Sequence, residues 1–269
     1  MLRDWDDAYA NMAHVPGAEA LPAAWAATAA AYREGLGAAF DGEIGYGDGD
    51  RARFDLVHPE GAARGLVVFV HGGYWMKFDK SFWTHLAAGA RARGWAVAMP
   101  SYPLAPGARI ARMTAATGAA IAAAAARVAG PLRLAGHSAG GHLVTRMLCA
   151  DSPLPGPLRD RLEQVVSISG VHDLRPLLNT TMNATLALDL AEARAESPAL
   201  AEPFGRPELV LWVGGAERPE FIRQSRLMAL MWDGFDGRVR VRIDADQNHF
   251  TVIEALAEAH SDLTRALAD

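Results

Sequence analysis

The segment Leu132–Leu143, LRLAGHSAGGHL, constrains the fold of this chain more than any other stretch. It starts with a short apolar run that predicts a buried strand, and it ends in an apolar run that predicts a helix. Between them, GHSAG around Ser138 fits the G-x-S-x-G pattern of a sharp strand-to-helix turn. Glycines flank the serine because the two backbones nearly touch at such a turn. We therefore predict a nucleophile elbow, with Ser138 at the head of a strand and the N–H groups of a helix N-terminus beneath its hydroxyl.

The rest of the chain alternates between strand patterns and helix patterns. Predicted strands cover residues 43–46, 52–57, 66–70, 95–99, 132–135, 165–169, 208–213 and 238–243, and predicted helices cover about 23–35, 81–93, 108–129, the stretch after Ser138 and 250–268. This alternation predicts an α/β fold with a mostly parallel, doubly wound sheet and an antiparallel edge made by the first two strands. Residues 1–269 are interpreted as a single domain with an N-terminal leader (1–42) and a small cap insertion (about 171–206). The cap leaves a strand at its carboxyl end, so we expect it beside Ser138.

Charge and composition exclude several classes of function. The net charge of −5 is modest, so we expect no nucleic-acid partner. The single cysteine, Cys149, cannot form an intrachain disulfide, and a buried apolar role is expected for it. The first residues lack the apolar core of a signal peptide, and the Ala-rich run 121–126 is too short to span a bilayer. These features predict a cytoplasmic protein without a membrane partner. The sequence does not set the oligomeric state, and a homodimer is compatible with it.

The sequence also predicts neither a metal site nor a cofactor. His137 and His142 are five residues apart, and the chain has no H-E-x-x-H motif and no paired cysteines. No G-x-G-x-x-G motif opens the first strand–helix unit, so a dinucleotide is not expected either.

A serine hydroxyl becomes a nucleophile when a base removes its proton, and an acid orients that base. With a G-x-S-x-G elbow the acid and the histidine follow the serine in that chain order. His249 lies after the last predicted strand, where the base is expected. Glu217, just past the preceding strand, is our preferred acid, with Asp246 and Asp173 as alternatives because they also follow strands.

The loop after the strand at 66–70 has the sequence His71-Gly72-Gly73-Tyr74-Trp75. Glycines allow backbone N–H groups to approach a reacting carbonyl oxygen, so this loop is expected to form an oxyanion hole. We assign the hole to the N–H groups of Gly72, Gly73 and Ala139. His71 is expected to brace the loop by hydrogen bonding, since Ser138 already has a better-placed base.

These motifs resemble those of the α/β-hydrolase superfamily, in its branch with an H-G-G-x-W oxyanion motif. Within the branch, the chain is most similar to the serine-dependent arylformamidases (kynurenine formamidases) and to bacterial relatives labelled esterases or thioesterases. The resemblance runs over nearly the whole chain. It is carried by Tyr9, Asn11 and Val15-Pro16 in the leader, and by residues 71–75, 136–141, 173–176, 217–221, 224–225 and 248–250. Glu217 departs from the aspartate of the better-known members.

The resemblance implies hydrolysis of N-formyl-L-kynurenine to L-kynurenine and formate, so the expected partner is a small acyl substrate, an aryl formamide or ester. Tyr74 and Trp75 are expected to wall in the small formyl group, and Trp75, Phe78 and Tyr102 suit an arylamine leaving group. Asn179 and Asn183 in the cap are candidates to hold the amino-acid end. The same machinery would serve a short-acyl carboxylesterase or thioesterase. A non-catalytic binding protein with the hydrolase fold is a further alternative.

Overall fold

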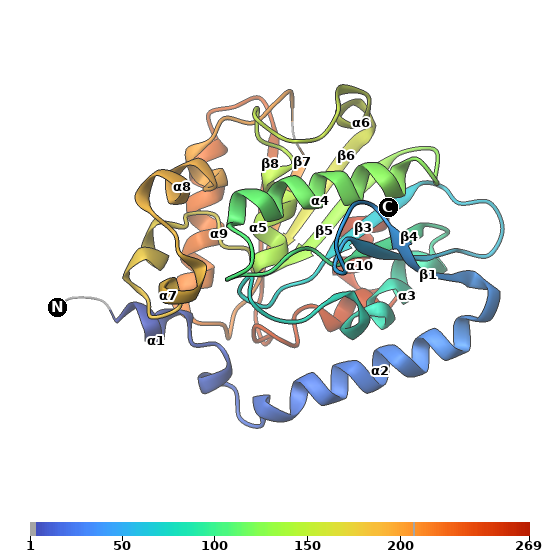
Figure 1. The fold of residues 1–269 in the computed structure, drawn as a ribbon, viewed down its shortest axis with the longest axis horizontal. Coiled ribbons are helices and arrows are strands. Elements are labelled where there is room, and N and C mark those ends of the chain that lie inside the picture. Colours follow the sequence, from blue (N-terminus) through green and yellow to red (C-terminus); the bar gives the residue numbers. More distant parts are fainter. Residues whose placement is uncertain (1–3, 207) are drawn as a thin grey trace.

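The computed structural model describes residues 4–206 and 208–269, in which eight strands form one sheet (Figure 1). The strand order is β1-β2-β4-β3-β5-β6-β7-β8. The bounds are β1 (Phe40–Gly45), β2 (Arg53–Val57), β3 (Leu66–Val70), β4 (Ala96–Pro100), β5 (Leu132–His137), β6 (Leu162–Ile168), β7 (Glu208–Gly214) and β8 (Arg238–Asp244). Strand β2 runs antiparallel to both of its neighbours, and the pairs from β4 through β8 are parallel. The prediction of a mostly parallel sheet with an antiparallel N-terminal edge is confirmed.

The two faces of the sheet are covered by different helices, which confirms the doubly wound arrangement (Figure 1). In β3, Leu66, Val68 and Val70 face a core shared with α4 (Ile110–Ala125), α5 (Ala139–Arg146) and α9 (Pro219–Trp232). Val67 and Phe69 face the opposite core, shared with α2 (Leu21–Leu36), α3 (Ala88–Ala92) and α10 (Asp262–Ala268). Successive strand residues point to opposite faces, so a strand covered on both sides is apolar throughout, as β3 is.

Two predicted helices are shorter than expected. The predicted helix 81–93 consists of the 3₁₀ turns η4 (Lys80–Phe82) and η5 (Thr84–Ala87), followed by α3. The predicted helix 250–268 is divided into η8 (Glu254–Ala257) and α10. Ser261 is the cause of the second break, because its hydroxyl accepts a hydrogen bond from the Thr264 N–H and starts a new helix. The remaining helices outside the predicted cap are α1 (Trp5–Tyr9), η1 (Met12–His14), η2 (Ala18–Ala20), η3 (Gly37–Ala39) and α6 (Gly156–Arg161).

The predicted cap holds four short helical pieces: η6 (Arg175–Asn179), α7 (Asn183–Leu186), α8 (Leu190–Ala195) and η7 (Pro198–Leu200). Arg109, just before α4, forms ion pairs with Asp189, the N-cap residue of α8, and with Glu192 in the first turn of α8. Figure 1 shows α7 and α8 beside α9 and α1, at one end of the sheet. In the part of the chain that the structure describes, no helix is long and apolar enough to cross a bilayer.

Candidate active site

Ser138 lies in a strained turn between β5 and α5, with φ 54° and ψ −114°. An L-residue rarely adopts this conformation, and such strain is typical of functional positions. The neighbouring glycines permit the turn. A Cβ atom at Gly136 would collide with the carbonyl oxygen of Gly140, and one at Gly140 would collide with that of Val70. The strand and the helix therefore approach too closely for any side chain, as the sequence pattern predicts.

His249 contacts Glu217 directly. Its Nδ1 lies 2.7 Å from Glu217 Oε2, and because a carboxylate can only accept, Nδ1 donates. Both side chains are buried. The other oxygen, Oε1, accepts hydrogen bonds from the Ser169 hydroxyl at 2.5 Å and from the Gly214 N–H at 2.7 Å. Two donors besides the imidazole thus hold this carboxylate so that Oε2 faces the ring.

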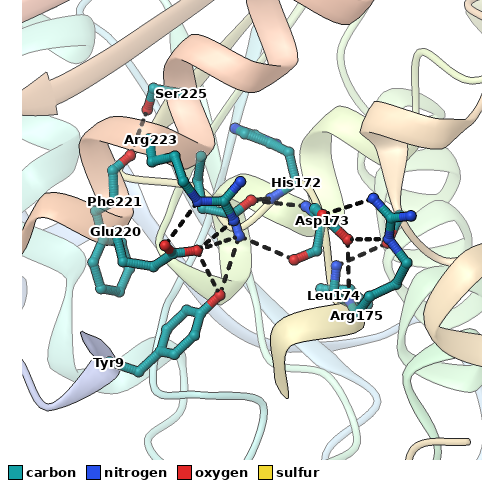
Figure 2. Close-up of polar contacts among 11 residues, drawn as sticks. Tyr9, His172, Asp173, Leu174, Arg175, Glu220, Phe221, Arg223 and Ser225 are labelled. Carbon is teal, nitrogen blue, oxygen red and sulfur yellow. Dashed lines mark hydrogen bonds and ion pairs between the residues drawn. The ribbon is translucent and has the colours of Figure 1, made fainter. Parts of the chain in front are cut away.

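The two alternative acids lie elsewhere. The Asp173 carboxylate accepts hydrogen bonds from Arg175, including one of 2.8 Å from Nε, so it is engaged within the cap (Figure 2). Asp246 is exposed on the loop after β8. The structure therefore selects Glu217 as the carboxylate in contact with His249, which the sequence left open among three residues.

Two groups fix the position of His249. The ring of His137 donates from Nε2 to the His249 carbonyl oxygen at 2.8 Å, and the Phe221 ring packs against the imidazole with centroids 4.4 Å apart. His249 and Ser138 line the same cavity. Among the described residues no hydrogen bond joins the Ser138 hydroxyl to the His249 ring. In enzymes, the hydrogen bond between a nucleophile and its base is commonly long until substrate binds.

The loop after β3 lies against the elbow. A Cβ built on Gly72 would fall 3.1 Å from Ser138 Cβ, so the Gly72 backbone is adjacent to the serine. Gly73 has φ 114°, and Tyr74 and Trp75 have φ values of 54° and 59°. Within the described chain, the N–H groups of Gly72 and Gly73 make no hydrogen bond to another residue. A strained loop with available donors beside Ser138 is the arrangement expected of an oxyanion hole.

His71 braces this loop. Burial lowers the pKa of His71 to about 4, so the ring is neutral, and its Nδ1 donates to the Gly72 carbonyl at 2.7 Å. Tyr102 stacks on the His71 ring with centroids 4.5 Å apart and donates its hydroxyl proton to the His71 carbonyl at 3.0 Å.

A cavity of about 300 Å³ opens in front of Ser138. Most of its lining is apolar, with aromatic walls, and its lining residues are Met12, Pro22, Trp25, Gly72, Gly73, Tyr74, Lys77, Phe78, Trp83, His137, Ser138, His249 and Phe250. Tyr74 and Phe78, expected near the substrate, are among them.

Four residues expected near the substrate lie outside this cavity. Trp75 is buried in the core, where it packs against His142 with ring centroids 5.3 Å apart. Tyr102 is fully buried behind His71. Asn183 closes a turn within the cap by exchanging hydrogen bonds with the Leu188 backbone, and Asn179 is exposed at the end of η6. Trp75 and Tyr102 were expected at the cavity, but their burial gives them a supporting role in the core and behind the loop. Asn179 and Asn183 lie in the cap as expected, and their contact with substrate stays a prediction.

The N-terminal segment, residues 4–25, forms the wall of the cavity that the cap was expected to form. Met12, Pro22 and Trp25 supply this wall, and sequence reasoning missed all three. Asn11 donates to the Tyr74 hydroxyl at 3.2 Å, and that hydroxyl donates to the Tyr9 carbonyl at 2.6 Å. Trp25 stands out in the Ala-rich sequence of α2, and it was the one sequence feature that could have indicated this wall.

Contacts with α9 hold the segment in place. Figure 2 shows Tyr9 pointing toward Glu220, to which its hydroxyl donates at 3.0 Å. Gln224 donates to the same Tyr9 hydroxyl at 3.1 Å, and Arg218 pairs with Asp7. The loop that carries Glu217 leads directly into α9, so the wall and the carboxylate that contacts His249 share one support.

The sheet order, the serine elbow and the carboxylate–imidazole contact define a class of hydrolytic enzyme. A model described as the alpha/beta hydrolase family matches residues 67–267, and the chain belongs to that family.

Within it, the chain is 26% identical to a kynurenine formamidase from Salmo salar, over 83% of this chain and 79% of the relative. It is 29% identical to a kynurenine formamidase from Drosophila melanogaster, over 82% and 78% of the two chains. A crystal structure of a proposed thioesterase from Silicibacter sp. TM1040 is 47% identical, covers both chains completely and superposes with a TM-score of 0.95.

Proposed function

We propose that this hydrolase is an arylformamidase that uses Ser138, His249 and Glu217 as a catalytic triad and converts N-formyl-L-kynurenine to L-kynurenine and formate. The observation that carries the proposal is the buried 2.7 Å contact between His249 and Glu217 at a cavity that also holds Ser138. The kynurenine formamidases that align with four-fifths of the chain support the choice of substrate.

The cavity is suited to an aryl formamide. Formyl is the smallest acyl group, so it needs little room between Ser138 and the oxyanion loop. The aromatic walls from Trp25, Phe78, Trp83 and Phe250 suit an arylamine leaving group, because aromatic rings pack favourably at stacked or edge-on geometry.

The reaction proceeds in two acyl-transfer steps. His249 takes the proton of Ser138 as the hydroxyl oxygen attacks the formyl carbon, and the N–H groups of Gly72, Gly73 and Ala139 stabilise the oxyanion. His249 then returns the proton to the leaving amine as the C–N bond breaks. Water attacks the formyl ester on Ser138 by the same route, which releases formate and restores the serine. Activity is expected to fall in acid, because an imidazolium cannot accept a proton.

The second candidate is a short-acyl carboxylesterase or thioesterase, which the 47% identical thioesterase-like relative favours. Steady-state kcat/KM for N-formyl-L-kynurenine, p-nitrophenyl acetate and an acetyl thioester would separate the two. We expect efficient formamide hydrolysis. Negligible formamide turnover beside brisk ester or thioester turnover would reject the arylformamidase assignment.

A fluorophosphonate probe tests the serine mechanism independently of substrate. We expect labelling of the wild-type protein and none of a Ser138→Ala variant with the same thermal stability. A folded wild-type protein that resists the probe would favour a non-catalytic binding protein.

A further inference from the structure

Lys77 is a lining residue of the cavity, and its positive charge has no matching negative charge among the other lining residues. In the described part of the chain, it is the only lysine or arginine that lines the cavity, and no aspartate or glutamate lines it. Its side chain forms no ion pair or hydrogen bond with another described residue. The other lining residues are mostly apolar, so they offer an anionic ligand few other polar partners.

The other lysine of the chain has a different environment. The sequence contains two lysines, Lys77 and Lys80, and uses arginine for every other basic side chain except histidine. Lys80 is buried and pairs with Glu43 and, at 2.8 Å, with Asp55, so its charge is satisfied within the fold. Lys77 is exposed, and its charge is available to a ligand.

The backbone of Lys77 is fixed to the oxyanion loop. Its N–H donates to the Gly73 carbonyl at 2.9 Å, and a Cβ at Gly73 would collide with the Lys77 carbonyl oxygen. The turn therefore holds the Lys77 backbone at a set place relative to Gly72 and Ser138. A flexible four-carbon stem on a fixed backbone can follow an anionic group within the cavity.

We infer that Lys77 is a specificity residue that binds a carboxylate on the leaving-group side of the substrate. The inference rests on the proposed function: a formyl group has no further atom to carry charge, so the anion must belong to the amine that departs. The ammonium would form a charge-assisted hydrogen bond with the carboxylate and orient the aryl ring between the aromatic walls. Lys77 takes no part in proton transfer.

The test compares a charged substrate with a neutral one in the full-length protein. The pair is N-formyl-L-kynurenine and 2′-formamidoacetophenone, which has the same aryl formamide but no amino-acid end. We expect Lys77→Met to lower the ratio of kcat/KM for the charged over the neutral compound by roughly tenfold, mainly through KM, and Lys77→Arg to retain most of it. Arg226→Met, which removes an exposed charge from α9, should leave the ratio unchanged. An unaltered ratio in Lys77→Met would overturn the inference.

A second measurement separates this inference from the proposed function. Inhibition of p-nitrophenyl acetate hydrolysis is measured with L-kynurenine and with its uncharged counterpart 2′-aminoacetophenone. If the formamide proves a poor substrate but L-kynurenine inhibits the wild type more strongly than Lys77→Met, the function fails and the anion site stands. If L-kynurenine inhibits both proteins equally, the anion site fails whatever the enzyme hydrolyses.

Discussion

The imidazole of His249 donates from Nδ1 to Oε2 of Glu217 over 2.7 Å, although glutamate has one more methylene than the aspartate of the better-known family members. The extra length is accommodated because the Ser169 hydroxyl and the Gly214 N–H both hold Oε1. The carboxylate is thereby turned so that its second oxygen faces the ring. A glutamate can therefore make the contact that an aspartate makes in these relatives, provided that its second carboxylate oxygen is held by other donors.

Replacement of Glu217 by glutamine tests this relationship. The neutral amide cannot stabilise an imidazolium, and we expect kcat/KM for p-nitrophenyl acetate to fall by roughly 10³–10⁴-fold, mainly in kcat. The thermal stability of the variant should be measured alongside, because Ser169 and Gly214 also lose a charged partner.

Asp246→Asn is the matched control, since Asp246 is an exposed carboxylate close to His249 in sequence. We expect its activity to stay within about twofold of wild type, as for most exposed substitutions. Equal losses in the two variants would contradict the role assigned to Glu217.

Much of the site could be predicted from local sequence, because its parts are short turns whose backbone geometry requires particular residues. The elbow around Ser138 and the glycines before Tyr74 require small residues at fixed spacing, which a sequence displays directly. Strand β3 can be predicted from its sequence because it is apolar on both faces. Helix α9 could also have been found, since Phe221, Met228 and Trp232 are spaced seven and four residues apart on one buried face.

The remainder depends on contacts between segments that are distant in sequence. Tyr9 and Glu220 are 211 residues apart, and no local pattern signals that the N-terminal segment walls the cavity. Likewise, Asp173, Glu217 and Asp246 all follow strands, and only the folded geometry shows that Glu217 reaches His249. Trp75 and Tyr102 show that residue type and position in the sequence do not set the direction of a side chain. Trp75 follows the glycines after β3 and Tyr102 follows β4, but both side chains are buried in the core.

Gly140 should tolerate no larger residue. A Cβ there would clash with the backbone oxygens of Val70 and His71, which belong to the central strand β3 and the loop that follows it and cannot move independently. We expect Gly140→Ala to lower the free energy of unfolding by about 3 kcal/mol or to prevent folding. Urea denaturation measures the effect.

Gly156→Ala is the comparison for that experiment, because nothing lies within 4 Å of a Cβ built at Gly156. We expect it to change the free energy of unfolding by less than about 1 kcal/mol and in the stabilising direction. Similar urea midpoints for the two variants would refute the packing argument for the elbow.

The hydroxyl of Tyr74 should control the order of the N-terminal segment. Tyr74→Phe leaves the Tyr9 carbonyl and the Asn11 amide without their shared partner, at a cost of about 1–3 kcal/mol to local stability. We expect faster hydrogen exchange in residues 5–20 and a higher KM, because this segment supplies a wall of the cavity.

Tyr46→Phe is the control for Tyr74→Phe, since it removes a hydroxyl that donates to the Ser101 carbonyl at 2.7 Å, away from the segment. Exchange in residues 5–20 should not change in this variant. If Tyr74→Phe exchanges at the wild-type rate there, the segment is held by its α9 contacts alone.

Buried histidines should make the fold sensitive to acid. Burial lowers the pKa of His142 to about 3 and that of His172 to about 3, and it holds the pKa of His137 well below the ordinary value of 6.5. Below pH 6.5 the unfolded chain takes up protons that the native chain does not, so stability decreases from about pH 6.5 downward toward the native pKa values. Each such histidine adds a slope of up to about 1.4 kcal/mol per pH unit.

Removal of one of these histidines should lower by one the number of protons taken up on unfolding in acid, and so reduce the pH dependence of stability. In His142→Gln the amide can still donate to the Glu196 carbonyl, which His142 Nε2 contacts at 2.7 Å, so the fold is expected to persist. Between pH 6 and 4.5, the free energy of unfolding from urea titrations should decline less steeply than in wild type, by about 1.4 kcal/mol per pH unit. His260→Gln, at an exposed position, should keep the wild-type slope. A His142→Gln slope equal to that of wild type would mean that the native protein protonates His142 as readily as the unfolded chain does, against its complete burial.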